Sequence, residues 1–131
     1  MKHKTSELTG ARLDQAVAKA CGYMYDNAID RTVVSSLDGS KTTLFFSFCA
    51  AVIDGKIREF SPSSVWADGG PIIERKKIGC YWIEEESLWR AGLDMHGYTP
   101  EFNLAQSHGP TLLISAMRSF VTTNLGDEVE L

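Results

Sequence analysis

The sequence predicts a small α+β domain, a sandwich of about three helices and an antiparallel sheet. Two strongly periodic helical segments, one near each end of the chain, and one clear hairpin between them predict this class. The chain has 131 residues, which is the size of one domain, so we treat residues 1–131 as a single domain. Its apolar (44%) and charged (23%) fractions are close to globular averages, which argues against disorder.

The first helix is predicted over Gly10–Cys21. Its apolar residues recur at helical spacing: Leu13, Ala16, Val17, Ala20 and Cys21. Thr9 is a suitable N-cap, and Gly22 suits the left-handed residue that ends many helices.

The last helix is predicted over Pro110–Leu125. Proline is favoured at a first helical position, and Gly126 is a suitable end. The apolar stripe consists of Leu113, Met117, Phe120 and Val121, and we expect it to lie in the core.

The remaining strands are predicted from β-rich runs and turn signals. Asp38-Gly39 and Asp54-Gly55 indicate hairpin turns. The expected strands are Thr32–Val34, Thr43–Phe48, Lys56–Phe60 and a hairpin over Ile78–Leu93. The run Cys49–Val52 fits either a strand or a helical turn. Asp94–His108 reads as a long loop, and Asp127–Leu131 as a short acidic tail.

The middle of the chain combines a helix start with helix breakers. Ser61-Pro62-Ser63-Ser64 favours a helix start. Gly69-Gly70-Pro71 inside a helix costs about 1 kcal/mol for each glycine and about 3 kcal/mol for the proline. We therefore expect a turn over Ser64–Asp68, a break, and a helix over Pro71–Lys77.

This break is the predicted binding site. The candidate residues lie in the segment Ser61–Arg75 and are Ser61, Ser63, Trp66, Asp68, Gly69 and Gly70. A helix starting at Pro71 directs its positive end at the break, which suits an acidic side chain or an anionic ligand, and Trp66 supplies a flat apolar wall. The alternative is that the break only turns the chain so that Ile72 and Ile73 reach the sheet, with Trp66 in the core.

Other clusters of reactive side chains fit plainer interpretations. Asp94, His96 and His108 form one possible metal site, but isolated loop histidines are ordinarily solvated. Glu84-Glu85-Glu86 with Asp94 form one possible carboxylate centre, but a charged turn that protects a hairpin edge is favoured. No nucleophile motif is present, although a spatial triad stays open. We expect no catalytic residue, no cofactor and no metal.

The charge pattern weighs against general duplex DNA binding, because the formal net charge is −4. Arg75-Lys76-Lys77 with Lys56 and Arg58 form a basic strip, which single-stranded nucleic acid would use together with Trp66, Tyr81 or Trp82. The polar end of a helix is the favoured interpretation.

The cysteines and the N-terminal sequence indicate a cytoplasmic protein. Cys21, Cys49 and Cys80 are widely spaced, odd in number and lie among apolar residues, which favours free thiols in a reducing compartment. Residues 1–5 lead into polar sequence without the apolar region of a signal peptide. No run is long enough to span a bilayer, so we expect no membrane partner.

Distinctive blocks of sequence are spread along the chain: Thr5–Gly10, Leu13-Asp14, Ala16–Ala18, Ser61–Ser63, Trp66-Ala67, Gly69–Arg75, Gly109–Thr111, Ala116–Arg118 and Leu125–Glu130. These blocks resemble the NinX family of lambdoid phages and prophages. They cover about half of the chain in matching order. The resemblance implies a bacterial host cell, an α-β-α sandwich and no catalytic residue.

Two functional classes follow. The first is a non-enzymatic binding or adaptor protein that acts on a host or phage macromolecule. The alternative is a small enzyme that acts on a nucleotide or similar anionic ligand at a site assembled from loops. Three Trp, four Tyr and six Phe are many for a core of this size, so we also expect self-association, as a homodimer.

Overall fold

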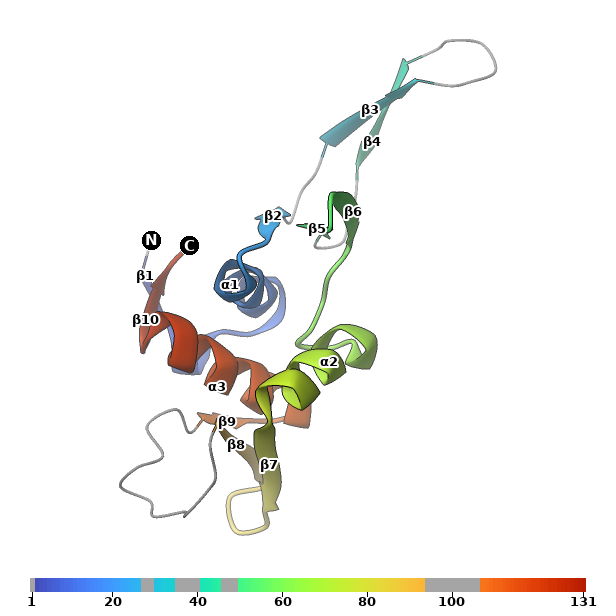
Figure 1. Ribbon diagram of the computed structural model, residues 1–131. Coiled ribbons are helices and arrows are strands. Elements are labelled where there is room, and N and C mark those ends of the chain that lie inside the picture. The colour runs from blue at the N-terminus through green and yellow to red at the C-terminus, as the bar shows by residue number, and fades with distance from the viewer. Residues whose placement is uncertain (1, 27–29, 35–40, 46–49, 94–106) are drawn as a thin grey trace.

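The computed structural model describes residues 2–26, 30–34, 41–45, 50–93 and 107–131 (Figure 1). This part of the chain forms three α-helices and short antiparallel strands, which confirms the α+β class. The helices are α1 (Gly10–Cys21), α2 (Trp66–Lys76) and α3 (Leu112–Leu125), with a short 3-10 helix η1 (Thr5–Glu7). The strands are β1 (Lys2–Lys4), β2 (Met24–Asp26), β3 (Asp30–Val34), β4 (Lys41–Phe45), β5 (Ala50–Ile53), β6 (Lys56–Glu59), β7 (Ile78–Ile83), β8 (Leu88–Leu93), β9 (Ser107–Gly109) and β10 (Glu128–Glu130).

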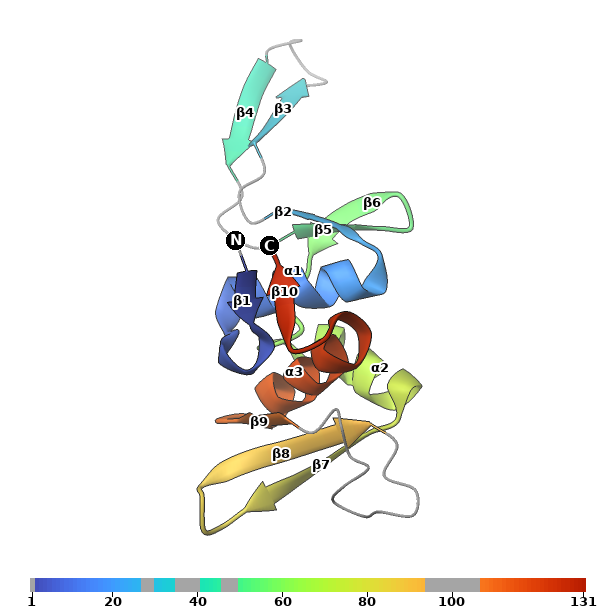
Figure 2. The ribbon, with the colours of Figure 1, turned by 90° about the vertical axis from the view of Figure 1, so that its left-hand side faces the viewer.

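Helix α3 lies at the centre of the molecule, between α1 and the sheet β7–β8–β9 (Figures 1 and 2). Its buried residues are Leu113, Ser115, Ala116, Met117, Ser119, Phe120 and Val121. A helix buried on several sides needs small residues where neighbours approach closely. Gly109 of β9 meets this need, because a Cβ there would lie 2.8 Å from the backbone nitrogen of Ser115.

Helix α1 has the predicted bounds. Gly22 ends it in the left-handed conformation, at φ 79° and ψ 18°. Thr9 occupies the N-cap position, but its side chain makes no capping hydrogen bond.

Helix α3 begins two residues later than predicted. Thr111 is the N-cap, and its hydroxyl accepts a hydrogen bond of 3.1 Å from the backbone nitrogen of Ile114. If the helix began at Pro110, its N-cap would be Gly109, which has no side-chain acceptor. Thr111 supplies one, so the proline precedes the cap instead of opening the helix. Gly126 ends the helix as expected, and its N–H donates to the carbonyl of Thr122 at 3.0 Å.

Helix α2 is continuous, so the predicted break at Gly69-Gly70-Pro71 is wrong. Pro71 lies inside the helix, and the hydrogen bond that it cannot donate would go to the carbonyl of Ala67. Both residues are exposed, so water can bond that carbonyl. Packing overrides the local propensities here, because Gly69 in the first half of α2 lies against the carbonyl of Pro62 and the side chain of Leu113 in α3.

Antiparallel pairing is divided among small sheets in the described part of the chain. β7 and β8 form the predicted hairpin and β9 extends it, while β2–β5–β6 forms a second three-stranded sheet. Asp54 and Gly55 both have positive φ, 52° and 76°, as a two-residue hairpin turn requires. Residues Ala50–Ile53 are a strand, which decides against a helical turn there. Asp38-Gly39 and Cys49 lie outside the described residues.

Two segments predicted to lack regular structure contain strands. The end of the predicted loop forms β9, which pairs with β8, and the acidic tail forms β10, which pairs with β1. In the second pair Lys2 faces Glu130 and Lys4 faces Glu128. Opposite charges across a strand pair stabilise it, and this long-range match is not visible in local sequence.

Candidate functional site

The turn that leads into α2 is held by carboxylates from two helices. Oδ2 of Asp68, in α2, accepts from the backbone nitrogen of Ser61 at 2.9 Å. Oδ1 of Asp14, in α1, accepts from the backbone nitrogen of Ser63 at 2.8 Å. The turn also closes on itself, because the N–H of Val65 donates to the carbonyl of Ser61 at 2.8 Å. The carboxylates therefore satisfy amides that would otherwise be buried without partners.

Both carboxylates are buried, and their partners explain how the fold tolerates them. Burial raises the pKa of Asp14, the hydrogen bonds from Ser63 lower it, and the charge of Asp68 raises it further. Asp68 also pairs with Arg58, whose Nη1 lies 3.3 Å from Oδ1. Ser61, Ser63 and Asp68 thus contribute to the entry of α2.

The two glycines of α2 differ in what surrounds them. A Cβ on Gly69 would lie 2.5 Å from the carbonyl oxygen of Pro62 and 2.7 Å from Cδ2 of Leu113. A Cβ on Gly70 would meet only Cε3 of Trp66, at 3.9 Å, which is an ordinary contact. Close packing of the turn and α3 therefore requires glycine at position 69 but not at position 70.

Trp66 is the predicted site residue that lies open to solvent. Its side chain is 58% exposed, and Val65 beside it is 37% exposed. A groove of about 320 Å³ lies between the start of α2, which carries Trp66, and the start of α3. Its lining consists of Ser63, Ser64, Trp66, Thr111, Leu112, Leu113 and Ile114. We call this the Trp66 groove; it is lined mainly by apolar side chains from the first turns of two helices.

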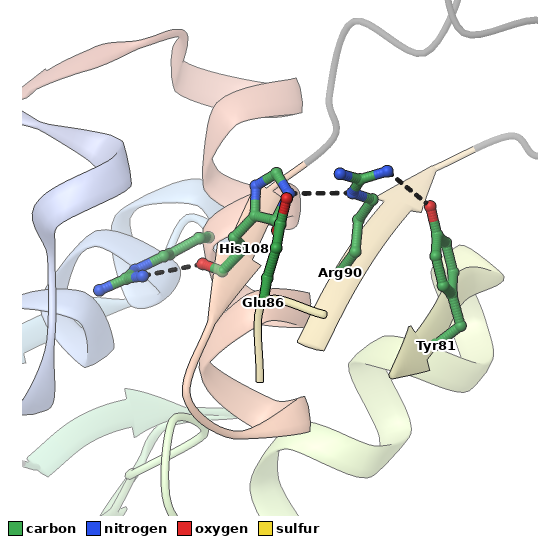
Figure 3. A network of polar contacts seen from close by, with 5 residues as sticks. Tyr81, Glu86, Arg90 and His108 are labelled. Atoms are coloured by element: carbon green, nitrogen blue, oxygen red, sulfur yellow. Dashed lines mark hydrogen bonds and ion pairs between the residues drawn. The ribbon is translucent and has the colours of Figure 1, made fainter. Parts of the chain in front are cut away.

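A second cluster, which the sequence did not predict, lies across the sheet β7–β8–β9 (Figure 3). Tyr81, Arg90 and His108 face one another in register on three neighbouring strands. Arg90 donates from Nη1 to the Tyr81 hydroxyl at 3.1 Å and from Nε to His108 Nε2 at 2.9 Å. Glu86, in the turn between β7 and β8, extends toward these three residues, and its Oε2 lies 3.8 Å from His108 Nε2. Because Arg90 only donates, His108 accepts at Nε2 and carries its ring proton on Nδ1.

His108 also borders a polar cleft of about 350 Å³. The cleft is lined by Lys4, Thr5, Ser6, Ser107, His108, Arg118, Thr122, Asp127 and Glu128. Arg118 is fixed there, because it donates to the backbone carbonyls of Leu8 and His108 at 2.9 and 2.8 Å. This cleft depends on β9 and on the pairing of the terminal strands, so no local sequence signal would have found it.

The other clusters proposed from the sequence are only partly visible. Asp94 and His96 lie outside the described residues, and no group of three metal-ligating side chains occurs among those that are described. Glu84–Glu86 form the exposed turn between β7 and β8, where Glu84 accepts from Trp82 Nε1 at 2.7 Å. Of the basic strip, Arg58 pairs with Asp68, while Arg75 and Lys76 lie in the last turn of α2, where the helix dipole favours cations.

The fold and these sites define a small α+β protein with an apolar groove and a polar cleft. A family model described as "Bacteriophage P22, NinX" matches residues 4–124. The chain therefore belongs to the NinX family of phage proteins, as the sequence blocks indicated. No curated protein matches it. In the part of the chain that the structure describes, no helix has the length and apolar character needed to cross a membrane.

Proposed function

We propose that this protein is a non-enzymatic binding or adaptor protein, and that its Trp66 groove holds an apolar segment of a phage or host protein. The supporting observation is the 58% exposure of Trp66 beside a groove lined by Leu112, Leu113 and Ile114. A large exposed aromatic residue next to apolar side chains is typical of protein contact sites, and Trp is among the residues that contribute most to binding energy.

The proposed groove is rigid, which favours binding. Asp14 and Asp68 fix the turn on one side of it, and the capped first turn of α3 forms the other side. A preformed surface loses less conformational entropy on binding than a flexible one. We place the protein in the cytoplasm of the bacterial host, and the free thiols of Cys21 and Cys80 support a reducing compartment.

A photo-crosslinking amino acid at position 66, introduced in infected bacteria, tests the groove directly. Mass spectrometry of the crosslinked product identifies the partner, and binding of the purified partner is then measured. We expect Trp66→Lys to weaken binding about 30-fold or more, the effect of losing a strong contact residue. Gly70→Ala is the matched control, because it changes the same helix without altering its packing. Equal binding by Trp66→Lys and the wild type contradicts the proposal.

The polar cleft beside His108 supports a second candidate, an anionic small-molecule site. Lys4, Arg118 and His108 line a volume that falls within the usual range for small-molecule pockets. Titration of the protein with a nucleoside monophosphate, followed by NMR, tests this candidate. Shifts confined to the cleft residues would favour it, whereas a spectrum that does not change would favour the adaptor.

A further inference from the structure

The strand β7 differs from the other edge strands of the described part of the chain. It forms one edge of the sheet β7–β8–β9, and no described strand lies beside its outer edge (Figures 1 and 2). It has six residues, Ile78–Ile83, and none is charged. The other described edge strands either carry charged residues, as β6 does with Lys56 and Arg58, or have only three residues, as β9 does.

Natural proteins protect edge strands with charge, proline or short length, because an open edge offers backbone groups to another chain. Within its own six residues β7 has none of these protections, and the charged turn Glu84–Glu86, which was expected to protect the hairpin edge, lies beyond its end. Tyr81 and Trp82 are 36% and 44% exposed, and as consecutive strand residues they point to opposite faces of the sheet. A strand added at this edge would therefore contact one aromatic side chain on each face.

The sequence that flanks β7 indicates which strand is added. Three cations, Arg75-Lys76-Lys77, precede the strand, and three anions, Glu84-Glu85-Glu86, follow it. All six residues are exposed. Lys77 adjoins the start of the strand and Glu84 and Glu85 follow its end, so when two copies run antiparallel these charges of each copy lie near the opposite charges of the other. Arg75 and Lys76 lie in the last turn of α2, and Glu86 lies near His108, so they are further from the edge. In an antiparallel pair of copies, opposite charges therefore meet at both ends of the strand. The strand itself is uncharged, so it places no like charges opposite each other.

We propose that β7 pairs antiparallel with β7 of a second copy of this chain, which joins two three-stranded sheets into one sheet of six strands. Each copy offers one such edge, so the assembly closes as a two-fold symmetric dimer. Backbone hydrogen bonds and the aromatic side chains supply the affinity. The charged flanks contribute less, because exposed ion pairs are weak, but they fix the antiparallel direction.

Light scattering on matched variants tests the interface. We expect the wild type to show twice the monomer mass of 14.5 kDa. Trp82→Lys places a charge on the edge and should yield monomers, whereas Trp66→Lys introduces the same charge on the other exposed tryptophan and should stay dimeric. Retained dimers in Trp82→Lys, or a wild type of monomer or indefinite mass, overturn the proposal. The same pair separates it from the proposed function, since Trp66→Lys should lose the partner but keep the dimer.

Charge reversal tests the direction of pairing. Lys76→Glu/Lys77→Glu and Glu84→Lys/Glu85→Lys each place like charges together at both flanks, so each should self-associate at least about tenfold more weakly than the wild type. Mixing the two variants restores opposite charges and should recover a heterodimer. If the mixture associates no better than either variant alone, the antiparallel arrangement is wrong.

If Trp82→Lys fails to fold, hydrogen exchange on the wild type tests the β7–β7 interface instead. The amides of Gly79–Ile83 that point away from β8 should exchange faster on dilution, because the dimer protects them. Exchange that does not depend on concentration contradicts the interface.

Discussion

The entry of α2 and the strand β7 each carry an exposed tryptophan, but they are built in opposite ways. At α2 the sequence is irregular, with serines, glycines and prolines, and the fold buries several residues of this segment, among them Ser63, Asp68 and Gly69. At β7 the sequence is an ordinary uncharged strand, and the fold leaves its aromatic residues half open. Part of the irregular sequence at α2 therefore serves close packing, whereas β7 is open although its sequence is ordinary.

The largest expected effect is on Gly69. Gly69→Ala should lower the free energy of unfolding by about 1–3 kcal/mol, because its Cβ would overlap the backbone of Pro62 and the side chain of Leu113. Gly70→Ala should be neutral or raise it by about 0.5–1 kcal/mol, since alanine is the better helix former and has room there. Chemical denaturation measures both. Equal effects of the two substitutions would show that packing does not distinguish these glycines.

Removal of the carboxylate that holds Ser63 should be the next largest effect. Asp14→Ala leaves the backbone nitrogen of Ser63 without its acceptor, which should lower the free energy of unfolding by about 1–3 kcal/mol. Asp14→Asn keeps an acceptor at the same place and serves as the control. A denaturation midpoint for Asp14→Ala equal to that of Asp14→Asn would show that the hydrogen bond from Ser63 to Asp14 does not stabilise the turn.

The same residue predicts a pH dependence. Burial raises the pKa of Asp14 above its usual 3.8, so the folded state binds the proton more tightly than the unfolded state. Stability from this group is therefore full below pH 3.8 and is lost as the pH rises through the folded pKa. Relative to the wild type, Asp14→Asn should become more stable as the pH rises above 3.8 and then level off. A difference that is constant with pH would show that the Asp14 proton is not linked to folding.

On the sheet, the hydroxyl of Tyr81 should matter less. Tyr81→Phe removes the acceptor of the 3.1 Å bond from Arg90 Nη1, and Tyr81 is partly exposed, so we expect a loss of about 0.5–1 kcal/mol. The side chain of Arg90 should then be less ordered, which NMR of its Nε–H reports. An unchanged Arg90 signal would indicate that the order of the Arg90 side chain does not depend on its hydrogen bond to Tyr81.

The smallest expected effect on stability is at Trp66. Trp66→Ala should change the free energy of unfolding by less than about 0.5 kcal/mol, because the side chain is 58% exposed. Thermal unfolding of the variant checks this value. A large loss would mean that Trp66 serves the fold.

Local sequence predicted the elements whose signals lie within a few residues. The bounds of α1, the turn at Asp54-Gly55, the β7–β8 hairpin and the end of α3 at Gly126 were all predicted. Periodicity, left-handed glycines and tight turns are properties of short segments, so a single sequence contains them. The family was also identified at this level, from blocks spread along the chain.

Tertiary structure decided the elements that depend on distant partners. The helix α2 continues through Gly69-Gly70-Pro71 because Gly69 fits against Pro62 and Leu113. β9 and β10 exist only as partners of β8 and β1, so the Arg90–His108 contact and the polar cleft follow from pairing that no local pattern encodes. The sequence determined which residues are unusual, and only packing decided which of them are buried, because burial depends on the whole chain.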